Sequence, residues 1–307
     1  SRKVKRFCTT SDINFLHRGL ALYESLNKYN KDFELYYLCS DEESYQKLKE
    51  LNLERIVAVS LEELFEKDQD LKNSKDNKPS YEAVNVGNKT NCDPKRVQFF
   101  WCLSSYFTWY VLDQEDTDDV LYIDPDIYFY HDWQLVYDEV ENKSIGVVRH
   151  RIPYSAAVGE YNVGIVYFNK DLSGYSCSTF WKDCLLDVEN KYYDTHGMCG
   201  DQKYLELFAP LSGEDNVCVI DTKVGHLAPW NLAYHRYTDN SIIWNQQIQP
   251  VVYYHFSDFK VNFDNDYYEI GPRHGFTKDT TPQMPKLVQN LCDEYFQALK
   301  RTKEMIK

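Results

Sequence analysis

The 307-residue chain is poor in positive charge, because 34 Lys and Arg residues stand against 48 Asp and Glu residues, which gives a formal net charge of −14. Nucleic-acid binding depends on a local excess of Lys and Arg, so a DNA or RNA partner is disfavoured. An acidic chain can still bind a phosphorylated ligand when a divalent cation lies between the two. The charge balance therefore argues against a polyanion but not against a small anionic ligand.

Paired cysteines and long apolar runs are also missing. The nine cysteines include no C-x-x-C pair, and their odd number argues against a disulfide scaffold or a zinc site. We therefore expect reduced, mostly buried thiols and a cytoplasmic setting. No apolar run approaches the length of a membrane span and no signal peptide is recognisable, so we expect no transmembrane segment. Peripheral association with a membrane stays open, as does a targeting segment removed before Ser1.

Hydrophobic and aromatic residues are present in quantity. Hydrophobic residues make up 43% of the chain and aromatic residues 16%, enough for a sizeable core and one large α/β domain with an extension. Tyr alone occurs 26 times. Tyr rings suit clefts that bind polar, ring-shaped ligands such as sugars and bases, because the ring is apolar and the hydroxyl can hydrogen-bond. A general drift of composition explains the same excess equally well.

Apolar residues alternate between the spacing of strands and that of helices along the chain. This order predicts right-handed crossovers, hence an α/β fold with a mostly parallel central sheet flanked by helices and a C-terminal helical extension. Strands are expected at residues 4–10, 33–39, 55–59, 120–123, 145–148, 162–168, 217–220 and 251–255. Helices are expected at residues 15–26, 42–51, 61–66, 96–112, 176–187, 201–208 and 285–307.

Residues 68–94 interrupt this alternation. The segment is rich in Lys, Asn and Asp and contains two prolines and a glycine. We expect a long surface loop, because loops of this length in compact domains are commonly lids or disordered segments.

The strongest local signal for chemistry is Asp124-Pro125-Asp126, which follows the apolar strand at 120–123. Open parallel sheets bind ligands at the carboxyl ends of their strands. Two carboxylates at such an end can hold Mg²⁺ or Mn²⁺, and the cation can in turn hold a diphosphate and make it a better leaving group. The alternative is a solvated acidic turn, and the motif by itself does not decide between the two.

Five segments in this order resemble nucleotide-sugar glycosyltransferases of the GT-A fold. They are similar to glycosyltransferase family eight, which includes glycogenin and the bacterial lipooligosaccharide galactosyltransferases. The segments are Phe7 to Asp12, Asp124 to Asp126, Tyr161 to Asn169, Gly200 to Gln202, and His255 to Lys260. Gly19 to Tyr23 (Gly-Leu-Ala-Leu-Tyr) and Ala228 to Asn231 (Ala-Pro-Trp-Asn) resemble more closely the family's uncharacterised bacterial and viral relatives. The resemblance implies a Rossmann-like GT-A domain over residues 1–260, followed by an extension over residues 261–307 that contains an amphipathic helix.

The resemblance also implies roles for the matching residues. Asp124, Asp126 and His255 would bind Mn²⁺ or Mg²⁺, a ligand set that suits manganese. Asn162, Asp201 and Gln202 would lie near the transferred sugar, where Asp201 is the first choice for a general base. Residues implied for the nucleotide-sugar donor, with UDP as the favoured nucleotide, are Thr9, Thr10, Asp12, Arg96 and Lys260. His226 is a lesser candidate for contact with the acceptor or a phosphate.

The activity implied is transfer of a hexose or pentose to a hydroxyl of a glycan or glycoconjugate, with retention of anomeric configuration favoured. Two departures from the family affect this expectation. Asp258 stands where the family usually has Gly, and its carboxylate would repel a diphosphate held by Lys260. The family also has an Arg inside the helix before the D-x-D strand, whereas here the nearest basic residues, Lys95 and Arg96, stand at the start of that helix.

Three other classes compete with this reading. A sugar nucleotidyltransferase would need a Gly-rich loop after the first strand, but the first glycine is Gly19, inside the predicted helix. A haloacid-dehalogenase-type phosphatase would need its D-x-D motif near the N-terminus and a Thr soon after it, and neither is present. A catalytically inactive, carbohydrate-binding relative stays open, although the intact Asp124, Asp126 and His255 argue against it.

Overall fold

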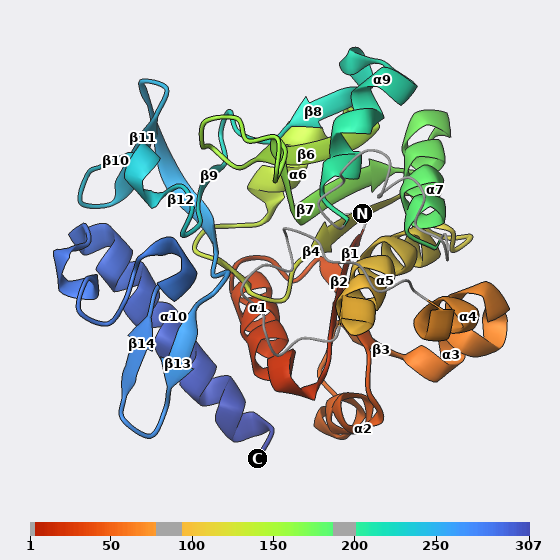
Figure 1. The fold of residues 1–307 in the computed structure, drawn as a ribbon, viewed down its shortest axis with the longest axis horizontal. Coiled ribbons are helices and arrows are strands. Elements are labelled where there is room, and N and C mark those ends of the chain that lie inside the picture. Colours follow the sequence, from red (N-terminus) through yellow and green to blue (C-terminus); the bar gives the residue numbers. More distant parts are fainter. Residues whose placement is uncertain (1–3, 78–93, 187–200) are drawn as a thin grey trace.

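A computed structural model describes residues 4–77, 94–186 and 201–307, with side chains in helix α5 described from Phe99 onward. Its centre is a seven-stranded sheet (Figure 1). β3, β2, β1 and β4 run parallel, β7 is antiparallel to β4 and β6, and β8 is parallel to β6. In spatial order the strands are β3 (Ile56–Ser60), β2 (Phe33–Cys39), β1 (Lys5–Ser11), β4 (Asp119–Ile123), β7 (Tyr161–Asn169), β6 (Ile145–Arg149) and β8 (Val217–Val219). The predicted α/β fold with a mostly parallel central sheet is confirmed.

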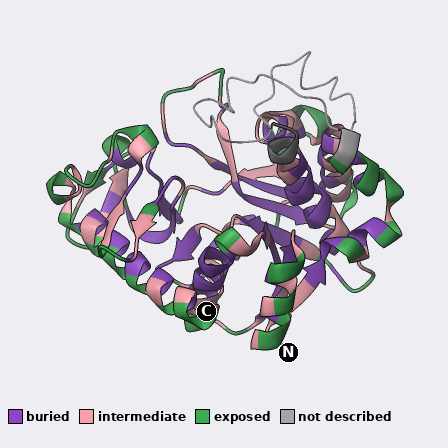
Figure 2. Cartoon of the chain, turned by 60° about the horizontal axis from the view of Figure 1, so that its bottom comes forward, coloured by how far each residue is buried: buried purple, intermediate pink, exposed green. Residues whose placement is uncertain are grey.

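Helices cover both faces of this sheet, because side chains alternate between the faces along each strand. On β1, Phe7 belongs to one buried cluster and Cys8 to the other. The cluster around Cys8 packs under α5 (Pro94–Leu112) and α7 (Leu172–Leu186), and the cluster around Phe7 packs under α1 (Leu16–Tyr29) and α6 (Gln134–Val140). Figure 2 shows the buried residues concentrated in the central strands and on the inner helix faces. Shorter helices are α2 (Glu42–Leu51), α3 (Leu61–Lys67) and α9 (Phe208–Ser212).

The expected loop at residues 68–94 is wrong for its first part. Residues Gln69–Asn77 form helix α4, and residues 78–93 lie outside the described part of the chain. The helix is held at its start by the Tyr106 hydroxyl, which donates to the Asp68 Oδ2 at 2.8 Å. Leu71 and Ser74 are fully buried. Because Leu71 is the one strongly apolar residue of this helix, no hydrophobic period marks it in the sequence.

A second sheet joins the D-x-D segment to a strand far along the chain. β12 (Gln247–His255) pairs antiparallel with β5 (Ile127–Phe129) and with β11 (Ser241–Trp244), and parallel with β9 (Gly225–Leu227). β11 also pairs with β10 (Arg236–Tyr237). The prediction for residues 251–255 therefore captured only the end of a longer strand, since exposed Gln247 and Ile248 extend it beyond the core. This second sheet places the end of β12 beside the carboxyl edge of the central sheet.

The C-terminal part packs against the same body (Figure 1). The hairpin of β13 (Lys260–Asn262) and β14 (Tyr267–Glu269) precedes helix α10 (Lys286–Met305), which packs on α1. The Tyr295 ring of α10 stacks on Phe256 with centroids 3.8 Å apart. Six short 3-10 helices complete the described elements: η1 (Ile13–Phe15), η2 (Lys203–Leu207), η3 (Glu214–Asn216), η4 (Leu232–Tyr234), η5 (Pro272–His274) and η6 (Thr281–Gln283).

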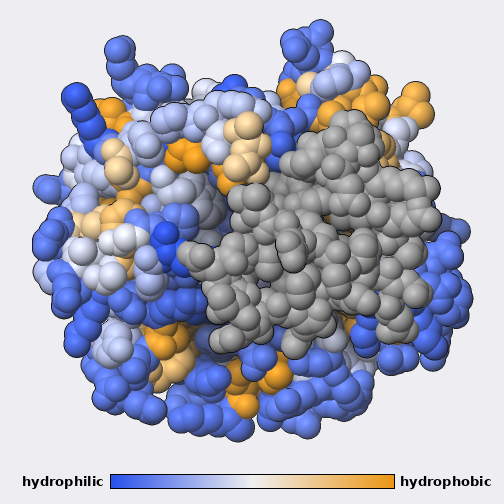
Figure 3. Space-filling view, viewed as in Figure 1, coloured by the Kyte–Doolittle hydropathy of each residue, from blue (hydrophilic) through white to orange (hydrophobic). Residues whose placement is uncertain are grey.

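The surface matches the acidic, polar composition. The face in Figure 3 is largely hydrophilic, with hydrophobic residues in scattered spots. Among the described residues, none of the helices is both long and apolar enough to cross a membrane. The cysteines of the described ranges are free thiols and most are buried, as expected from their spacing.

Candidate active site

The candidate site forms at the carboxyl edge of the central sheet. β4 ends at Ile123, and Asp124-Pro125-Asp126 follow at this edge. β7 runs the other way, so its first residues reach the same edge, and the Asp124 amide donates to the Gly164 carbonyl at 2.8 Å. The short strand β5 then leads away and pairs with β12 in a register that sets His255 opposite Ile127. The Phe256 amide donates to the Asp126 carbonyl at 2.8 Å, which fixes the two segments together.

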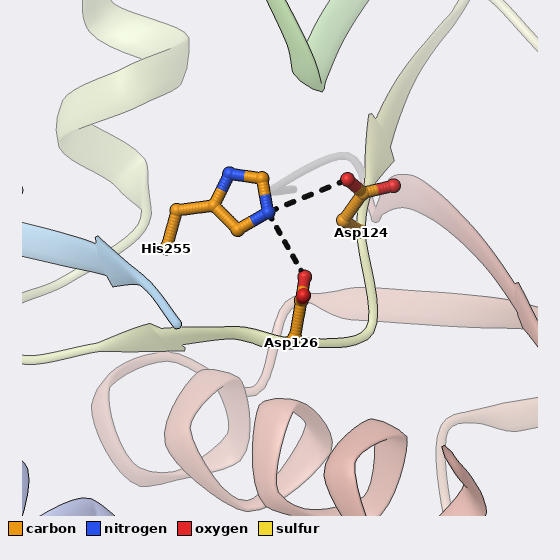
Figure 4. Close-up of side chains that lie close together, drawn as sticks. All are labelled: Asp124, Asp126 and His255. Atoms are coloured by element: carbon orange, nitrogen blue, oxygen red, sulfur yellow. Dashed lines mark ion pairs between the residues drawn. The ribbon is translucent and has the colours of Figure 1, made fainter. Parts of the chain in front are cut away.

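Asp124, Asp126 and His255 converge on one point (Figure 4). The His255 Nε2 lies 3.0 Å from the Asp126 Oδ1 and 3.5 Å from the Asp124 Oδ2. One ligand atom from each residue lies within 4.8 Å of the others. Two carboxylate oxygens and an imidazole nitrogen in this arrangement fit the donor preferences of Mn²⁺, so these residues could hold the predicted metal.

The other ring nitrogen of His255 is held by a neighbouring amide. Asn162 Oδ1 accepts from the His255 Nδ1 at 3.2 Å and from the Gly164 amide at 2.8 Å. With a proton held on Nδ1, Nε2 can offer its lone pair to a cation placed between it and the two carboxylates, which is how residues around metal sites orient a histidine ligand. A side chain at Gly164 does not fit, because its Cβ would lie 2.7 Å from the His255 ring and 2.6 Å from the Asn162 Oδ1.

Burial and mutual charge shift the titration of these groups. Burial, with the Asp126 charge second, raises the pKa of Asp124 to about 6, while the Tyr122 hydroxyl donates to the Asp124 Oδ1 at 2.7 Å. Burial opposes ionisation of Asp126 and His255, but their attraction outweighs it, so the pKa of Asp126 is lowered and the pKa of His255 is raised. In the metal-free protein, the two carboxylates therefore favour protonation of His255 at the point where a cation would otherwise bind.

Two cavities meet at Asp124. The first has a volume of about 370 Å³ and is bordered by the ends of β1 and β4 and by α5. Thr10 and Asp12, predicted from the resemblance to contact the nucleotide, both line it. Thr9 does not, because it is fully buried. The full lining of the first cavity is Thr10, Ser11, Asp12, Phe15, Phe100, Trp101, Ser104, Tyr122, Asp124, Pro125, Val163 and Asp201.

The second cavity has a volume of about 710 Å³ and contains the whole Asp–Asp–His cluster. Asn162, Asp201 and Gln202, the three predicted catalytic residues, also line it. The structure thus gathers the predicted metal ligands and the predicted catalytic residues around one space. Its remaining lining residues are Trp101, His150, Ile152, Ser155, Val158, Val163, Trp230, Ser257, Arg273 and His274.

Asp201 lies where the two cavities join. It is 6% exposed, and its Oδ2 accepts from the Ser104 hydroxyl at 2.7 Å. Burial raises the pKa of Asp201 to about 7, and the Asp124 charge adds to the effect. Asp201 does not stand at the N-cap position of η2, which is occupied by Gln202 without a side-chain capping hydrogen bond. A buried carboxyl with a pKa near neutrality can accept or donate a proton.

Gln202 is tied into the frame of the second cavity. Its Oε1 accepts from the Asn162 Nδ2 at 3.2 Å, and its Nε2 donates to the Val158 carbonyl at 2.8 Å. A chain of side-chain contacts therefore runs from His255 through Asn162 to Gln202. The geometry gives Asn162 a supporting role for His255 that the sequence did not predict.

The structure does not bring every predicted residue to the cavities. The Lys260 side chain is 63% exposed, is paired with the Asp258 carboxylate at 3.5 Å and does not line them. His226 is buried and stacks on Tyr253 with centroids 5.3 Å apart. Arg96 lies in the first turn of α5, where the structure describes no side chain.

The lining residues of the second cavity that were not predicted include two imidazoles, an indole and a guanidinium, which belong to His150, His274, Trp230 and Arg273. The Trp230 ring lies edge-on to His255 at 5.3 Å and near His274 at 6.0 Å. The Ala-Pro-Trp-Asn segment around Trp230 was a recognisable signal that could have found it. His150, Arg273 and His274 come from loops or a 3-10 turn and carry no local pattern.

Two bacterial proteins are similar in sequence to most of this chain. No protein-family model matches the chain. The uncharacterized protein YfnF of Bacillus subtilis (strain 168) is 26% identical over 311 residues, which cover 95% of this chain and 92% of that protein. The uncharacterized protein YfnD of the same strain is 24% identical over 276 residues, which cover 85% of this chain and 80% of that protein.

Among solved structures, the apo form of mouse xyloside xylosyltransferase 1 matches with a TM-score of 0.54 at 14% sequence identity. The match covers 82% of this chain and 97% of that chain. The element order, the mostly parallel sheet and this match agree with the fold predicted from the five sequence segments. The chain has a GT-A glycosyltransferase-like fold.

Proposed function

We propose that the protein is a metal-dependent glycosyltransferase. It transfers a hexose or pentose from a nucleoside-diphosphate sugar, with UDP as the favoured nucleotide, to a hydroxyl of a glycan or glycoconjugate. The observation that carries the proposal is the convergence of Asp124, Asp126 and His255 at the junction of two cavities. One cavity is large enough for a nucleoside and the other for sugars, and a metal-held diphosphate would span the junction.

The donor set supports a hard or borderline divalent cation. Two carboxylate oxygens and one imidazole nitrogen, with the second imidazole nitrogen held by Asn162, fit Mn²⁺ and also accept Mg²⁺. When bound, the cation neutralises the charge that develops on the leaving diphosphate. Asn162 and Gly164 keep the His255 ring in place for this function.

The side chains around the first cavity suit a nucleoside. Thr10 and Asp12 offer hydrogen-bonding groups, and Phe15 and Trp101 offer aromatic surface for a base. The second cavity adds Trp230 with polar neighbours, a combination that suits sugar rings. These linings support donor binding with the base in the first cavity and the transferred sugar in the second.

We favour retention of anomeric configuration, as the resemblance to family eight implies. In that case the acceptor hydroxyl attacks the face from which the diphosphate leaves, and a diphosphate oxygen takes the acceptor proton. If the enzyme inverts, a carboxylate must take this proton, and Asp201 is the candidate. Its pKa of about 7 would leave it partly ionised at neutral pH.

The experiment that tests the proposal is a donor screen. The protein is incubated with Mn²⁺ and a panel of UDP-, GDP-, ADP- and CDP-sugars, and release of the nucleoside diphosphate and the sugar is followed by NMR. We expect slow hydrolysis of one donor, and the anomer released first reports retention or inversion. Binding of a donor without turnover, even with added glycan acceptors, would favour an inactive carbohydrate-binding relative.

A further inference from the structure

The strongest feature outside the proposed metal and catalytic groups is the pair Asp258–Arg273. Asp258 has φ = 59°, in the left-handed region that favours Gly, at the position where the resembling family usually has Gly. Its side chain is fully buried. Asp tolerates this conformation better than most residues, so Asp258 can contribute a carboxylate here without disrupting the turn.

The Asp258 carboxylate holds Arg273 through two separate contacts. The Arg273 amide donates to the Asp258 Oδ2 at 2.7 Å, and the Arg273 Nε lies 3.1 Å from the Asp258 Oδ1. The Arg273 backbone is therefore held by a hydrogen bond, and the guanidinium is kept beside the carboxylate by an ion pair in which the Asp258 Oδ1 accepts no hydrogen bond. The Nη groups have no partner among the described residues, and the Arg273 side chain is 47% exposed.

Arg273 is also the single Lys or Arg among the described residues that line the two cavities. The same lining contains the carboxylates of Asp12, Asp124, Asp126 and Asp201. Burial lowers the pKa of His150 and His274, so these neighbours are neutral at pH 7. An anionic ligand in this space therefore meets one permanent protein cation besides the metal.

We infer that Arg273 binds the phosphate oxygens of the donor diphosphate and that Asp258 is its positioning residue. The inference rests on the proposed function. It assigns to Arg273 the diphosphate contact that the family resemblance implied for Lys260. The Nη atoms of a guanidinium form a planar fork, which matches two phosphate oxygens, and the ion pair with Asp258 keeps this fork beside the second cavity. Asp258 then supports phosphate binding rather than opposing it, because its charge is neutralised by Arg273 and Lys260.

The test is calorimetric titration of UDP, and separately of uridine, in the presence of Mn²⁺. If another nucleoside diphosphate binds the wild-type protein better, that diphosphate and its nucleoside are used. We expect Arg273→Gln to weaken UDP binding by roughly tenfold to a hundredfold and to leave uridine binding unchanged. Arg273→Lys should recover only part of the loss, because it restores the charge without the fork.

Three further variants separate positioning from mere loss of charge. Asp258→Gly should weaken UDP binding less than Arg273→Gln and leave uridine binding unchanged, because Gly accepts the same backbone conformation. Lys260→Gln should keep wild-type affinity. Arg301→Gln, which breaks the exposed ion pair between Arg301 of α10 and Glu24 of α1, is the matched control for an arginine-to-glutamine change elsewhere.

The outcomes are distinct. Wild-type UDP affinity in Arg273→Gln, or an equal loss for UDP and uridine, would overturn the inference while leaving the proposed function intact. If Lys260→Gln weakens UDP binding and Arg273→Gln does not, Lys260 is the residue that binds the diphosphate and the inference is wrong. If Arg273→Gln raises KM for the acceptor alone, the arginine recognises an acidic acceptor and the inference is wrong. A wild-type protein that binds no nucleoside diphosphate with Mn²⁺ would contradict the proposed function itself.

Discussion

The two cavities that meet at Asp124 differ in the side chains that line them. The described lining of the first cavity contains aromatic and hydroxyl groups and carboxylates but no Lys, Arg or His. The lining of the second contains three imidazoles, Trp230 and the guanidinium of Arg273. Under the proposed function, the first cavity would bind the nucleoside by stacking and hydrogen bonds, and the second would hold the diphosphate charge and the groups that transfer a proton.

The two cavities also differ in where their residues come from. Most of the first lining follows strands of the central sheet or belongs to α5, so the order of the α/β fold positions it. Much of the second comes from residues beyond 225, which reach the site only because β12 pairs with β5. The second cavity therefore depends on a tertiary pairing that spans more than 100 residues of sequence, as the register of His255 with Ile127 shows.

The largest expected effect comes from removing a proposed metal ligand at the junction. Asp126→Ala, and likewise Asp124→Ala, should reduce turnover by more than about a thousandfold, since the cation supplies several kcal/mol of charge stabilisation. The fold should persist, because both residues stand at a strand end. Turnover and circular dichroism check this, with the exposed Asp138→Ala as the matched control. An active Asp126→Ala protein in the presence of a chelator would refute the metal role.

A second prediction concerns Asp201 and compares its effect on the reaction rate with its effect on UDP affinity. If the enzyme inverts and Asp201 takes the acceptor proton, Asp201→Asn should lower kcat by about a hundredfold, the typical contribution of a positioned proton acceptor. The amide can still accept from the Ser104 hydroxyl, so the fold and the affinity for UDP should change little. Steady-state kinetics and calorimetry give the two numbers. Equal losses in rate and affinity would make Asp201 a structural residue.

A smaller effect is expected from changing the support of His255. Gly164→Ala places a Cβ 2.7 Å from the His255 ring, so the imidazole must move. Mn²⁺ affinity should fall by about tenfold to a hundredfold, as for other changes to the groups that orient metal ligands. Calorimetric titration with Mn²⁺ measures this, and uridine binding is the internal control for the first cavity. Unchanged Mn²⁺ affinity would show that His255 does not bind the metal.

The smallest expected effect concerns acid stability near the second cavity. His235 is buried as the neutral form, with its Nδ1 donating to the Asn231 carbonyl and its Nε2 accepting from Arg151, and burial lowers its pKa to about 4. Between pH 6.5 and 4 the unfolded state binds the extra proton, so stability falls as pH falls. The free energy of unfolding falls by about 1.4 kcal/mol per pH unit because of this residue.

Urea unfolding of the wild type and of His235→Gln at pH 7 and 5.5 measures this loss. The free energy of unfolding should depend less on pH in the variant. An equal dependence would assign the acid sensitivity to other groups, and the exposed His131→Gln is the control.

The sequence predicted those parts of the fold and site in which the local pattern and the tertiary structure agree. The four residues before Asp124-Pro125-Asp126 are apolar and buried, and His255 ends another strand whose last five residues are buried. The ends of these two strands could therefore be recognised in the sequence. Helix α4 could not, because Leu71 alone marks its buried side. The first part of β12, before Val251, was not predicted either. Gln247 and Ile248 are both exposed, so polar and apolar residues do not alternate there between a solvent face and a buried face.

Arg273 shows why the second cavity was harder to predict. Nothing in the sequence around Arg273 distinguishes it from other surface arginines. Its orientation depends on Asp258, whose carboxylate looked unfavourable for phosphate binding until the structure showed the Arg273 amide and Nε bound to it. Likewise, Asn162 was predicted to face a sugar, and only its distance to the His255 Nδ1 reveals the supporting contact.

The central claim is that Asp124, Asp126 and His255 bind a divalent cation that holds a nucleoside diphosphate between the two cavities. Calorimetric titration of UDP into the wild-type protein, with Mn²⁺ and with a chelator, tests it most directly, and Asp126→Ala is titrated in parallel. The account predicts UDP binding that requires Mn²⁺ in the wild type and is lost in Asp126→Ala. Binding of UDP that is equal with and without Mn²⁺, or equal in the two proteins, would contradict it.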